Sequence, residues 1–489
     1  MMDIKAIRLR NFRGFLDARI ELKPLTVLIG PNSAGKSSFG QALAAMAHAH
    51  RLYAAGAPGP VSLTPPVDFA DTWPVDLGKT SDLRTVGAKG PVCVGLETTR
   101  GDLLELGFGG LEQHTSDLLI SYILHPSGQS GSASTPTNPT IVSGEKSAST
   151  VASAHTAIVK PPDAQSGVVP VPLTATIPTI GAPIKLERLN EQQWQEEWSV
   201  VLKGLSILAV EHKTGMQRIL SGAARESLRS LLESLTYLRA TRERPSRGYR
   251  DDVGKQQPIG YSGEWTPSIL YRRGLDPVTY FVPPDIANSV DEARKIDYVW
   301  KEKQETLLEG VGTWLSRLAL ATAIETVPPS PIDSRVKLRA TLNGQGSHDI
   351  TEIGFGVSQV IPVLVAGLLQ PKDSLFIVDL PEAHLHPRPQ GAIADFFCSL
   401  ALSGKTALVE THSETFFHRL RLRAAQNPSL KDKIAVYFID PPKNGICSDP
   451  RPVGLAFEDE LQWPEQFLEE AYETEIQINA VRQARDSSS

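Results

Sequence analysis

The sequence predicts an α/β fold in which a mainly parallel sheet carries a phosphate-binding loop. A buried-strand pattern at 25–29 leads into the glycine-containing segment 30–37, and a helical pattern follows it. Between about residues 303 and 440, apolar runs of strand length alternate with helical patterns, which is typical of a parallel sheet. The chain has 489 residues, of which 41% are hydrophobic and 21% charged, so it can fill a sizeable core.

The first half of the chain divides into three kinds of segment. Residues 4–29 predict short strands, and a helix is expected from Lys36 to about Leu52. Residues 126–183 are rich in Ser, Thr, Pro and Ala and have no helical period, which predicts a poorly ordered insertion or loose β-loops. Residues 185–245 carry leucines at three- and four-residue spacing, which predicts helices. An arginine cluster ends this region: Arg239, Arg242, Arg244, Arg247 and Arg250.

The second half should return to the sheet. Helices are expected around 307–323, 358–369 and 389–402, and strands at 336–342, 374–380, 406–410 and 434–439. An acidic stretch without Lys or Arg follows at 458–475. We therefore divide the chain into 1–120 and 303–445 as two parts of one head, 121–185 as the Ser/Thr/Pro-rich insertion, 186–302 as a helical insertion, and 446–489 as an acidic cap.

Charge and cysteine content exclude several classes of protein. The net charge of −6 argues against a uniformly basic nucleic-acid binder. Three separated cysteines without CxxC spacing argue against a disulfide scaffold or a thiolate zinc site. The start of the chain lacks the apolar segment of a secretory signal, and the longest apolar run, 360–369, is too short for a membrane span. A soluble, cytoplasmic protein without membrane contact is expected.

Segment 30–37 satisfies the pattern G-x-x-x-x-G-K-[ST]. Its glycines allow backbone N–H groups to wrap a phosphate, and the following helix adds the positive end of its dipole. The lysine reaches the outer phosphates and the serine hydroxyl binds Mg²⁺. The motif therefore predicts binding of ATP or GTP with Mg²⁺. The candidate nucleotide-binding residues here are Gly30, Asn32, Gly35, Lys36, Ser37 and Ser38.

Asp379 ends the apolar run 374–378 and is a candidate Mg²⁺ ligand together with Ser37. The alternative for a lone strand-end Asp is a helix cap. His384 and His386 follow closely and resemble metal ligands, but two alternate residues make only half of a zinc site.

Two further segments carry candidate site residues. Residues 354–359, with two glycines and Ser358 before a helix expected at Val360, either form a second anion cradle or cap the helix structurally. His412 follows the strand 406–410, which places it at the ligand-binding edge of a parallel sheet. A surface turn histidine is the alternative.

Taken together and in order, these segments resemble the ABC-type ATPase heads of the SMC, RecF-like and OLD-like group. IKAIRLRNFRGF, GPNSAGKSS, GFGVSQV, VDLPEAHLHP and VETHSE are similar to that group's N-terminal strand, Walker A, signature, Walker B and His switch. Further pieces resemble stand-alone bacterial AAA-type ATPases with a short C-terminal extra domain: VDLGKTSDL, YLRATRERP and WPEQF. The resemblance covers about 1–110 and 235–470. It implies a P-loop ABC-type head with N-terminal antiparallel strands.

The resemblance also implies a mechanism. Two heads would sandwich two nucleotides, with Gly356 and Ser358 of one chain facing the γ-phosphate held by Lys36 and Ser37 of the other. His412 would sense that phosphate, and hydrolysis would release the dimer. A homodimer or higher homo-oligomer through the heads is therefore expected.

One position departs from the group's pattern. Relatives commonly have a Glu directly after the Walker B carboxylate to orient the attacking water, and this chain has Leu380. Leucine cannot accept a proton, so either Glu382 or His412 takes the catalytic role, or turnover is slow or dependent on a partner. Weak basal ATPase activity is expected.

Several biological functions are compatible with such an ATPase. The short stretch after His412 leaves no room for the Toprim nuclease of OLD-like relatives, so a separate, nuclease-like effector is expected. By analogy the protein would act as a switch or scaffold in anti-phage defence or a DNA-linked process. Nucleic acid is a candidate partner for Lys5, Arg8, Arg10, Arg13 and the arginines from Arg239 to Arg250, and the alternative for all of them is a solvated or ion-paired surface. A transporter's energising subunit and a nucleotide-binding structural protein are the alternatives.

Overall fold

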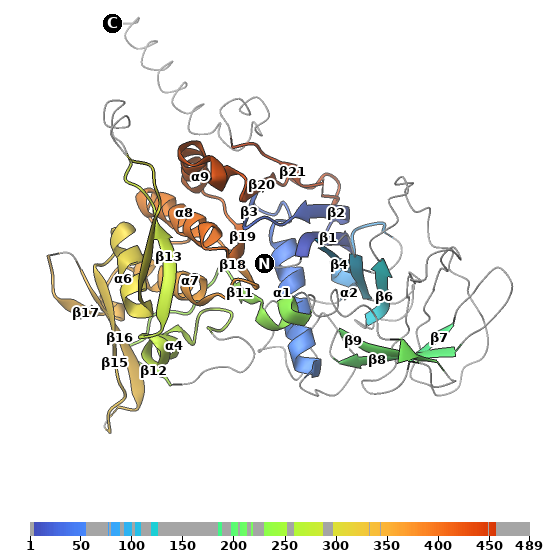
Figure 1. Ribbon diagram of the computed structural model, residues 1–489, viewed down its shortest axis with the longest axis horizontal. Helices are drawn as coiled ribbons and strands as arrows, with labels where there is room; N and C mark the ends of the chain where they lie inside the picture. Colours follow the sequence, from blue (N-terminus) through green and yellow to red (C-terminus); the bar gives the residue numbers. More distant parts are fainter. Residues whose placement is uncertain are drawn as a thin grey trace, which may run out of the picture.

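The structure is a computed structural model (Figure 1), and the regions it describes form five sheets and the helices around them. It describes residues 4–54, 77, 80–88, 92–99, 103–108, 119–125, 184–187, 197–203, 206–212, 217–218, 229–251, 259–286, 297–331, 333–342, 344–447 and 449–455. The Ser/Thr/Pro-rich segment 126–183 and the acidic residues 458–475 lie outside these residues.

A six-stranded sheet in the order β11-β18-β19-β3-β20-β21 forms the centre of the fold. The first five strands are parallel, and β21 pairs antiparallel with β20. Their apolar runs are buried on both faces, as a covered parallel sheet requires. The strands are β3 (Leu25–Ile29), β11 (Thr236–Leu238), β18 (Leu375–Asp379), β19 (Thr406–Glu410), β20 (Ile434–Phe438) and β21 (Arg451–Pro452).

Two hydrophobic clusters cover the two faces of this sheet. Leu375, Ile377 and Leu408 pack with helix α1 (Ser37–Ala54), whereas Phe376 and Val409 pack with helices on the opposite face. Alternate residues of a strand point to opposite faces, so this division assigns each strand side chain to one layer. The helices of the second face are α6 (Leu307–Arg317), α7 (Phe355–Leu369), α8 (Pro387–Leu402) and α9 (Glu414–Gln426) (Figure 1).

An antiparallel sheet in the order β2-β1-β4-β5-β6 packs on the far side of α1. Its strands are β1 (Ile4–Phe12), β2 (Phe15–Glu21), β4 (Val92–Thr98), β5 (Leu103–Phe108) and β6 (Leu119–His125). The expected N-terminal antiparallel strands are thereby confirmed. The Glu21 backbone N–H donates a hydrogen bond to the Tyr437 hydroxyl on β20 (3.0 Å) and so joins the two sheets.

Smaller elements complete the described parts. A four-stranded sheet has the order β10-β9-β8-β7, and another joins β12, β16 and β15 with β17 at its side. Their bounds are β7 (Ile184–Glu187), β8 (Glu197–Lys203), β9 (Ser206–His212), β10 (Gln217–Arg218), β12 (Tyr249–Arg250), β15 (Ala323–Val327), β16 (Arg335–Thr341) and β17 (Ser347–Asp349). A hairpin pairs β13 (Pro277–Val282) with β14 (Lys301–Thr306). Further helices are α2 (Thr80–Leu83), α4 (Thr266–Arg273), α10 (Pro428–Lys431) and the 3-10 helix η2 (Ile350–Glu352), and residues 229–234 are also helical.

The prediction of a helical insertion at 186–302 is wrong for most of its described residues. They include β7 to β10 and the β13–β14 hairpin, whereas residues 229–234 and α4 are helical. The prediction rested on leucine spacing, but valines and isoleucines such as Val200, Val201 and Ile207 stand between the leucines and favour strands.

Two helix limits also differ from the predictions. The helix expected over 307–323 ends at Arg317, and β15 then uses the β-branched residues Ile324, Thr326 and Val327. The helix expected at Val360 begins at Phe355, because the Gly354 carbonyl already accepts a hydrogen bond from the Val357 N–H (3.0 Å). The motif 354–359 therefore forms the first turns of α7.

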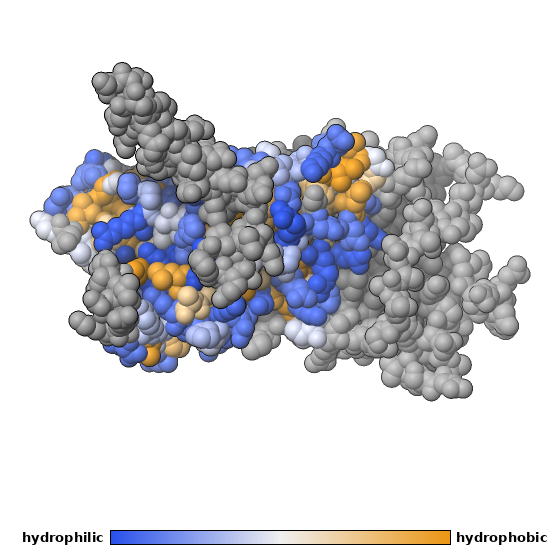
Figure 2. Space-filling model, turned by 90° about the horizontal axis from the view of Figure 1, so that it is seen from above, coloured by the Kyte–Doolittle hydropathy of each residue, from blue (hydrophilic) through white to orange (hydrophobic). Residues whose placement is uncertain are grey.

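The described surface is mostly hydrophilic in the view from above, and its hydrophobic residues form small, separate patches (Figure 2). Large exposed hydrophobic side chains lie on different elements, for example Leu16 on β2, Leu275 after α4 and Phe355 on α7. None of the described helices combines the length and the hydropathy that crossing a bilayer requires.

Candidate nucleotide-binding site

The loop 30–37 connects β3 to α1 at the carboxyl edge of the central sheet. Gly30 has a φ of 141°, and a Cβ there would lie 2.4 Å from the carbonyl oxygen of Ile439. Gly35 has a φ of 97°, which also favours glycine. Because both positions exclude larger side chains, the loop can turn its backbone N–H groups toward an anion at the start of α1.

Lys36 closes back on the loop. Its Nζ donates hydrogen bonds to the carbonyl oxygens of Gly30 (3.0 Å) and Pro31 (2.6 Å), and the residue is 3% exposed. Burial lowers the pKa of Lys36, while the carboxyl groups of Glu410 and Glu382 act in the opposite direction. A phosphate entering the loop would offer the ammonium group a charged acceptor in place of two carbonyls.

Two carboxylates end neighbouring strands beside this loop. Asp379 of β18 pairs in register with Glu410 of β19, and β19 lies between β18 and the loop's own strand β3. Both side chains share the sheet face that α1 covers, because Ile377 and Leu408, two residues earlier, pack in the α1 cluster. A cavity of about 350 Å³ opens here, lined among others by Ser37, Gln41, Tyr237, Arg239, Asp379 and Glu410.

Tyr237, within β11, and Arg242, after β11, both hydrogen-bond to the end of β18. The Tyr237 hydroxyl donates to Asp379 Oδ2 (2.5 Å). The Arg242 guanidinium donates to the carbonyl oxygens of Asp379 (2.9 Å) and Leu380 (3.1 Å). Leu380 has a φ of 47°, and its N–H donates to the Glu410 carbonyl (2.9 Å). The turn after Asp379 is therefore fixed from both neighbouring strands.

The charge state of the two carboxylates reflects their burial. Burial, and then the nearby Glu410, raise the pKa of Asp379, whereas the Tyr237 hydroxyl opposes this shift. Burial also raises the pKa of Glu410, against a hydrogen bond from Ser37 and the charge of Lys36. Two buried acids beside each other favour the arrival of a cation, which relieves their repulsion.

The donor set fits a magnesium ion. The Ser37 hydroxyl and the Asp379 carboxylate are hard oxygen donors that line one cavity, and the Glu410 carboxylate lies in the same lining. Glu410 Oε2 is buried without a hydrogen-bond partner among the described residues. In the described part of the chain, no group of three or more His, Cys, Asp or Glu side chains could hold a metal by itself. An ion here would therefore complete its shell with phosphate or water oxygens, as Mg²⁺ does.

The structure places Glu382 and His412 beside this site but not in the cavity lining. Glu382 Oε1 accepts hydrogen bonds from the Thr411 hydroxyl (2.7 Å) and the His412 N–H (3.0 Å), so this carboxylate supports the turn after β19. Burial raises the pKa of Glu382. The pKa of His412 is lowered by burial and by Lys36, and the Gly30 backbone opposes this shift. His412 therefore lies at the phosphate loop, as expected for a residue at this sheet edge.

Gly356 and Ser358 lie in the first turn of α7, and neither lines the cavity beside Ser37. A Cβ on Gly356 would lie 2.8 Å from the carbonyl oxygen of His384, so α7 packs closely on the segment after β18. The Ser358 hydroxyl donates to the Phe355 carbonyl (2.7 Å). Within one chain, this motif is therefore separate from the loop 30–37. Asn32 of that loop is exposed, and Ser38 is buried.

The two histidines after β18 do not form a metal centre with described residues. His384 is exposed, has a φ of 64°, and packs edge-on against Phe355 with ring centroids 4.9 Å apart. His386 caps the start of α8 through its backbone position. In the described fold, His384 therefore packs against Phe355, and His386 marks the start of α8.

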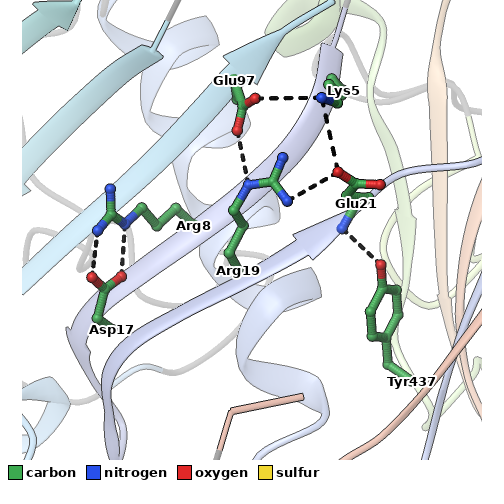
Figure 3. A network of polar contacts seen from close by, with 7 residues as sticks. All are labelled: Lys5, Arg8, Asp17, Arg19, Glu21, Glu97 and Tyr437. Carbon is green, nitrogen blue, oxygen red and sulfur yellow. Dashed lines mark hydrogen bonds and ion pairs between the residues drawn. The ribbon is translucent and has the colours of Figure 1, made fainter. Parts of the chain in front are cut away.

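Lys5, Arg8 and Arg19 of the N-terminal strands contact carboxylates (Figure 3). Lys5 lies 3.9 Å from carboxylate oxygens of Glu21 and Glu97, and Arg8 forms an ion pair with Asp17. Arg13 donates to the Gln41 side chain and borders the cavity. Lys5 and Arg8 therefore belong to an ion-paired surface.

The arginine cluster 239–250 separates into different environments. Arg242 is buried behind β18, Arg239 borders the cavity, and Arg247 lies 3.3 Å from Glu352. These residues do not act as one basic surface, and one of them supports the candidate site directly.

Sequence reasoning missed Glu410, Tyr237 and Arg242 as site residues. Glu410 had the same signal as Asp379, since each is the acidic last residue of an apolar strand. Tyr237 and Arg242 had no such signal, because the pairing of β11 with β18 brings them to Asp379 from 142 and 137 positions away in the chain.

Two family models match the segments that build this site. One, described as "AAA ATPase domain", matches residues 2–72. The other, described as "AAA domain, putative AbiEii toxin, Type IV TA system", matches residues 289–417. The matched segments contain the phosphate loop and the strands that end in Asp379 and Glu410.

Solved structures of SMC head domains are similar over most of the chain. The Smc head domain from Pyrococcus furiosus, with an extended coiled coil and bound to the C-terminal domain of ScpA, is 9% identical, with a TM-score of 0.40. That comparison covers 94% of this chain and 98% of the other. The SMC head domain from Thermotoga maritima is 10% identical with a TM-score of 0.31, over 92% and 99% of the two chains. No curated protein matches the sequence.

The two family matches and the strand–loop–helix geometry agree with each other. The chain is a P-loop ATPase with an α/β fold, and the prediction of this class is confirmed. Its ATPase segments come from both ends of the described chain, and the central sheet brings them together.

Proposed function

We propose that this ATPase binds Mg·ATP in the cavity beside segment 30–37 and acts as a slow, nucleotide-dependent switch for a separate effector. One observation supports the proposal above the others. Ser37 at the end of the phosphate loop and the strand-end acid Asp379 line one cavity from segments far apart in the chain, and Lys36 beside Ser37 lies folded onto the loop.

Each residue has a distinct task in this proposal. Backbone N–H groups of the loop, from Gly30 through Asn32 and Gly35 to Ser38, hold the phosphates, and Lys36 neutralises their charge. The Ser37 hydroxyl and the Asp379 carboxylate would hold Mg²⁺, which supplies positive charge against the phosphates during transfer. His412 senses the terminal phosphate from the turn after β19.

The signature motif supports action between two chains. Gly356 and Ser358 start a helix outside the cavity of their own chain, and Phe355 beside them is 41% exposed. A helix N-terminus of this kind favours an anion. The terminal phosphate of a second chain is the ligand that this placement suits, so nucleotide would join two heads.

The biological setting that we propose is cytoplasmic anti-phage defence or a DNA-linked process, with a nuclease-like protein as the effector. The description of the family matched at 289–417 names a toxin of a type IV toxin–antitoxin system, which supports a defence role. The resemblance to OLD-like ATPases supports a partner that supplies the nuclease chemistry.

Sedimentation velocity with a non-hydrolysable ATP analogue and Mg²⁺ tests the switch. Wild type should sediment as a larger species with the analogue than with ADP. Ser358→Arg should bind the analogue without this change, because a bulky cation fills the interface. Ser330→Arg is the control, since Ser330 is an exposed loop residue outside the motif. An analogue-independent sedimentation coefficient of wild type would contradict the proposed switch.

A further inference from the structure

The catalytic carboxylate of this ATPase remains to be assigned, because Leu380 occupies the position directly after Asp379. Leu380 lines the cavity but offers no acceptor for a water proton. Glu382 keeps one carboxylate oxygen on Thr411 and His412, and its other oxygen is buried without a partner among the described residues, but the residue is not part of the cavity lining. Neither residue therefore presents a free acceptor to the cavity.

Glu410 is the second strand-end carboxylate in the cavity lining. It ends β19, between the strand that leads into the phosphate loop and the strand that ends in Asp379. The residue is 8% exposed and lines the same cavity as Ser37 and Asp379. One side of its carboxylate accepts a hydrogen bond from Ser37, and Oε2 is buried without a partner among the described residues.

A buried acceptor without a partner is costly unless a ligand or water satisfies it. The residue lines the cavity beside Ser37, where we propose that the outer phosphates of the nucleotide lie. The charge of Lys36 also acts on this carboxylate. A place in the cavity lining and free acceptor capacity thus coincide at Glu410.

We propose that Glu410 is the catalytic carboxylate that orients and deprotonates the attacking water, in place of the acid missing at position 380. This inference rests on the proposed binding of Mg·ATP in the cavity. The water oxygen forms a bond to the γ-phosphorus while the bond from that phosphorus to the β,γ-bridging oxygen breaks. The electron pair of the broken bond stays on ADP, and the water proton passes to the Glu410 carboxylate and then to the released phosphate.

The test compares isosteric amide variants in one set of measurements. Glu410→Gln should lower kcat by about 10²-fold, the scale of a lost general base, while the affinity for Mg·ATP changes less than about threefold. Glu305→Gln makes the same change at a half-buried carboxylate on β14 that hydrogen-bonds to Thr313, away from the cavity. This control should keep both kcat and affinity.

A rescue experiment separates a catalytic role from a structural one. In the double variant Leu380→Glu/Glu410→Gln, the carboxylate moves to the neighbouring strand end, and turnover should recover at least tenfold over Glu410→Gln alone. A structural loss at position 410 would not recover in this way.

The outcomes are distinguishable. Unchanged kcat in Glu410→Gln, or loss of turnover in Glu382→Gln alone, would overturn the assignment of Glu410 while leaving nucleotide binding intact. Loss of Mg·ATP binding in Glu410→Gln would also overturn it, because Glu410 would then serve binding and not the chemical step. Absence of Mg·ATP binding by wild type would instead contradict the proposed function itself.

Discussion

At the residue scale, the site depends on backbone geometry as much as on charged groups. The carbonyl of Ile439 approaches Gly30 so closely that the loop and the end of β20 fit together only without a Cβ. Lys36 then fills the interior of the loop with its ammonium group on two carbonyls. The loop is therefore shaped for a ligand before any ligand arrives, which reduces the entropy that binding must overcome.

Gly30→Ala tests this shape. The new Cβ would meet the Ile439 carbonyl at 2.4 Å in a conformation with a φ of 141°, so the loop must move. We expect the affinity for Mg·ATP, measured by fluorescence titration, to fall by at least about tenfold, from a strain of over 1 kcal/mol. Gly346→Ala is the matched control, because nothing lies within 4 Å of its Cβ. Equal affinities of the two variants would contradict the account of the loop.

Tyr237 is a second residue-scale test, because its hydroxyl supports the Asp379 carboxylate at 2.5 Å. Outer hydrogen bonds of this kind orient a metal ligand, and their loss commonly weakens metal binding tenfold or more. Tyr237→Phe should therefore weaken Mg²⁺ binding to the ATP complex by about tenfold and leave Mg²⁺-independent ATP binding unchanged. Tyr249→Phe, whose hydroxyl contacts the Ser246 N–H instead, serves as the control in the Mg²⁺ titration. Unaltered Mg²⁺ affinity in Tyr237→Phe would separate Tyr237 from metal binding.

At the element scale, helix α1 connects the two sheets and carries two buried histidines. His48 is fully buried, and its Nδ1 lies 2.7 Å from the Tyr261 hydroxyl. Burial, and then the charge of Arg51, lower its pKa to about 4. The helix that begins with Ser37 at the nucleotide site is thus held in place through neutral imidazole groups.

The lowered pKa of His48 predicts how the stability of the fold changes with pH. Between pH 6.5 and about 4, the unfolded chain binds a proton on His48 and the folded chain does not, so stability falls as the pH falls. At pH 5 the loss is about 2 kcal/mol. Thermal unfolding at pH 7 and pH 5 should show a smaller drop in Tm for His48→Gln than for wild type. A dependence remains in the variant, because burial also lowers the pKa of His50. Identical drops in Tm would exclude His48 as its source.

The sequence predicts helices and strands well where a segment has one clear hydrophobic pattern. The run 25–29 before the glycines and the strand 406–410 were identified closely, since buried parallel strands have continuous apolar sequences. Most described residues of 185–245 form strands and only 229–234 a helix, because leucine spacing alone does not distinguish a helix from strands in which β-branched residues stand between the leucines. Helix α7 begins before the predicted position, because Gly356 lies inside its first turn although glycine usually favours a helix boundary.

The candidate site could be predicted from the sequence only in part. Lys36, Ser37 and Asp379 stand in patterns whose chemistry is local, and the structure brings them to one sheet edge. Glu410 becomes a site residue only through its register with Asp379, and Tyr237 only through the pairing of β11 with β18. Strand pairing across long separations is set by the whole fold, which a local pattern does not contain.

At the scale of the whole molecule, the central sheet assembles one ATPase from two distant segments of the chain. The strand of the phosphate loop lies between β19 and β20, which come from the far end of the sequence. The cavity therefore exists only when both segments are folded together, and nucleotide binding should stabilise the complete head. The signature motif on α7 lies outside the cavity of its own chain. In the proposed sandwich, a complete site therefore needs residues from two molecules.

Isothermal titration calorimetry with Mg·ATP tests the central claim most directly. We predict saturable heat for wild type and none for Lys36→Ala, because that variant removes the cation inside the loop. Lys405→Ala is the matched control: it removes another buried lysine whose Nζ donates to two backbone carbonyls, those of Gly367 and Leu368, at the opposite end of β19. This variant should still bind. The absence of heat on folded wild-type protein, or equal heat from Lys36→Ala, would contradict a nucleotide site at this loop.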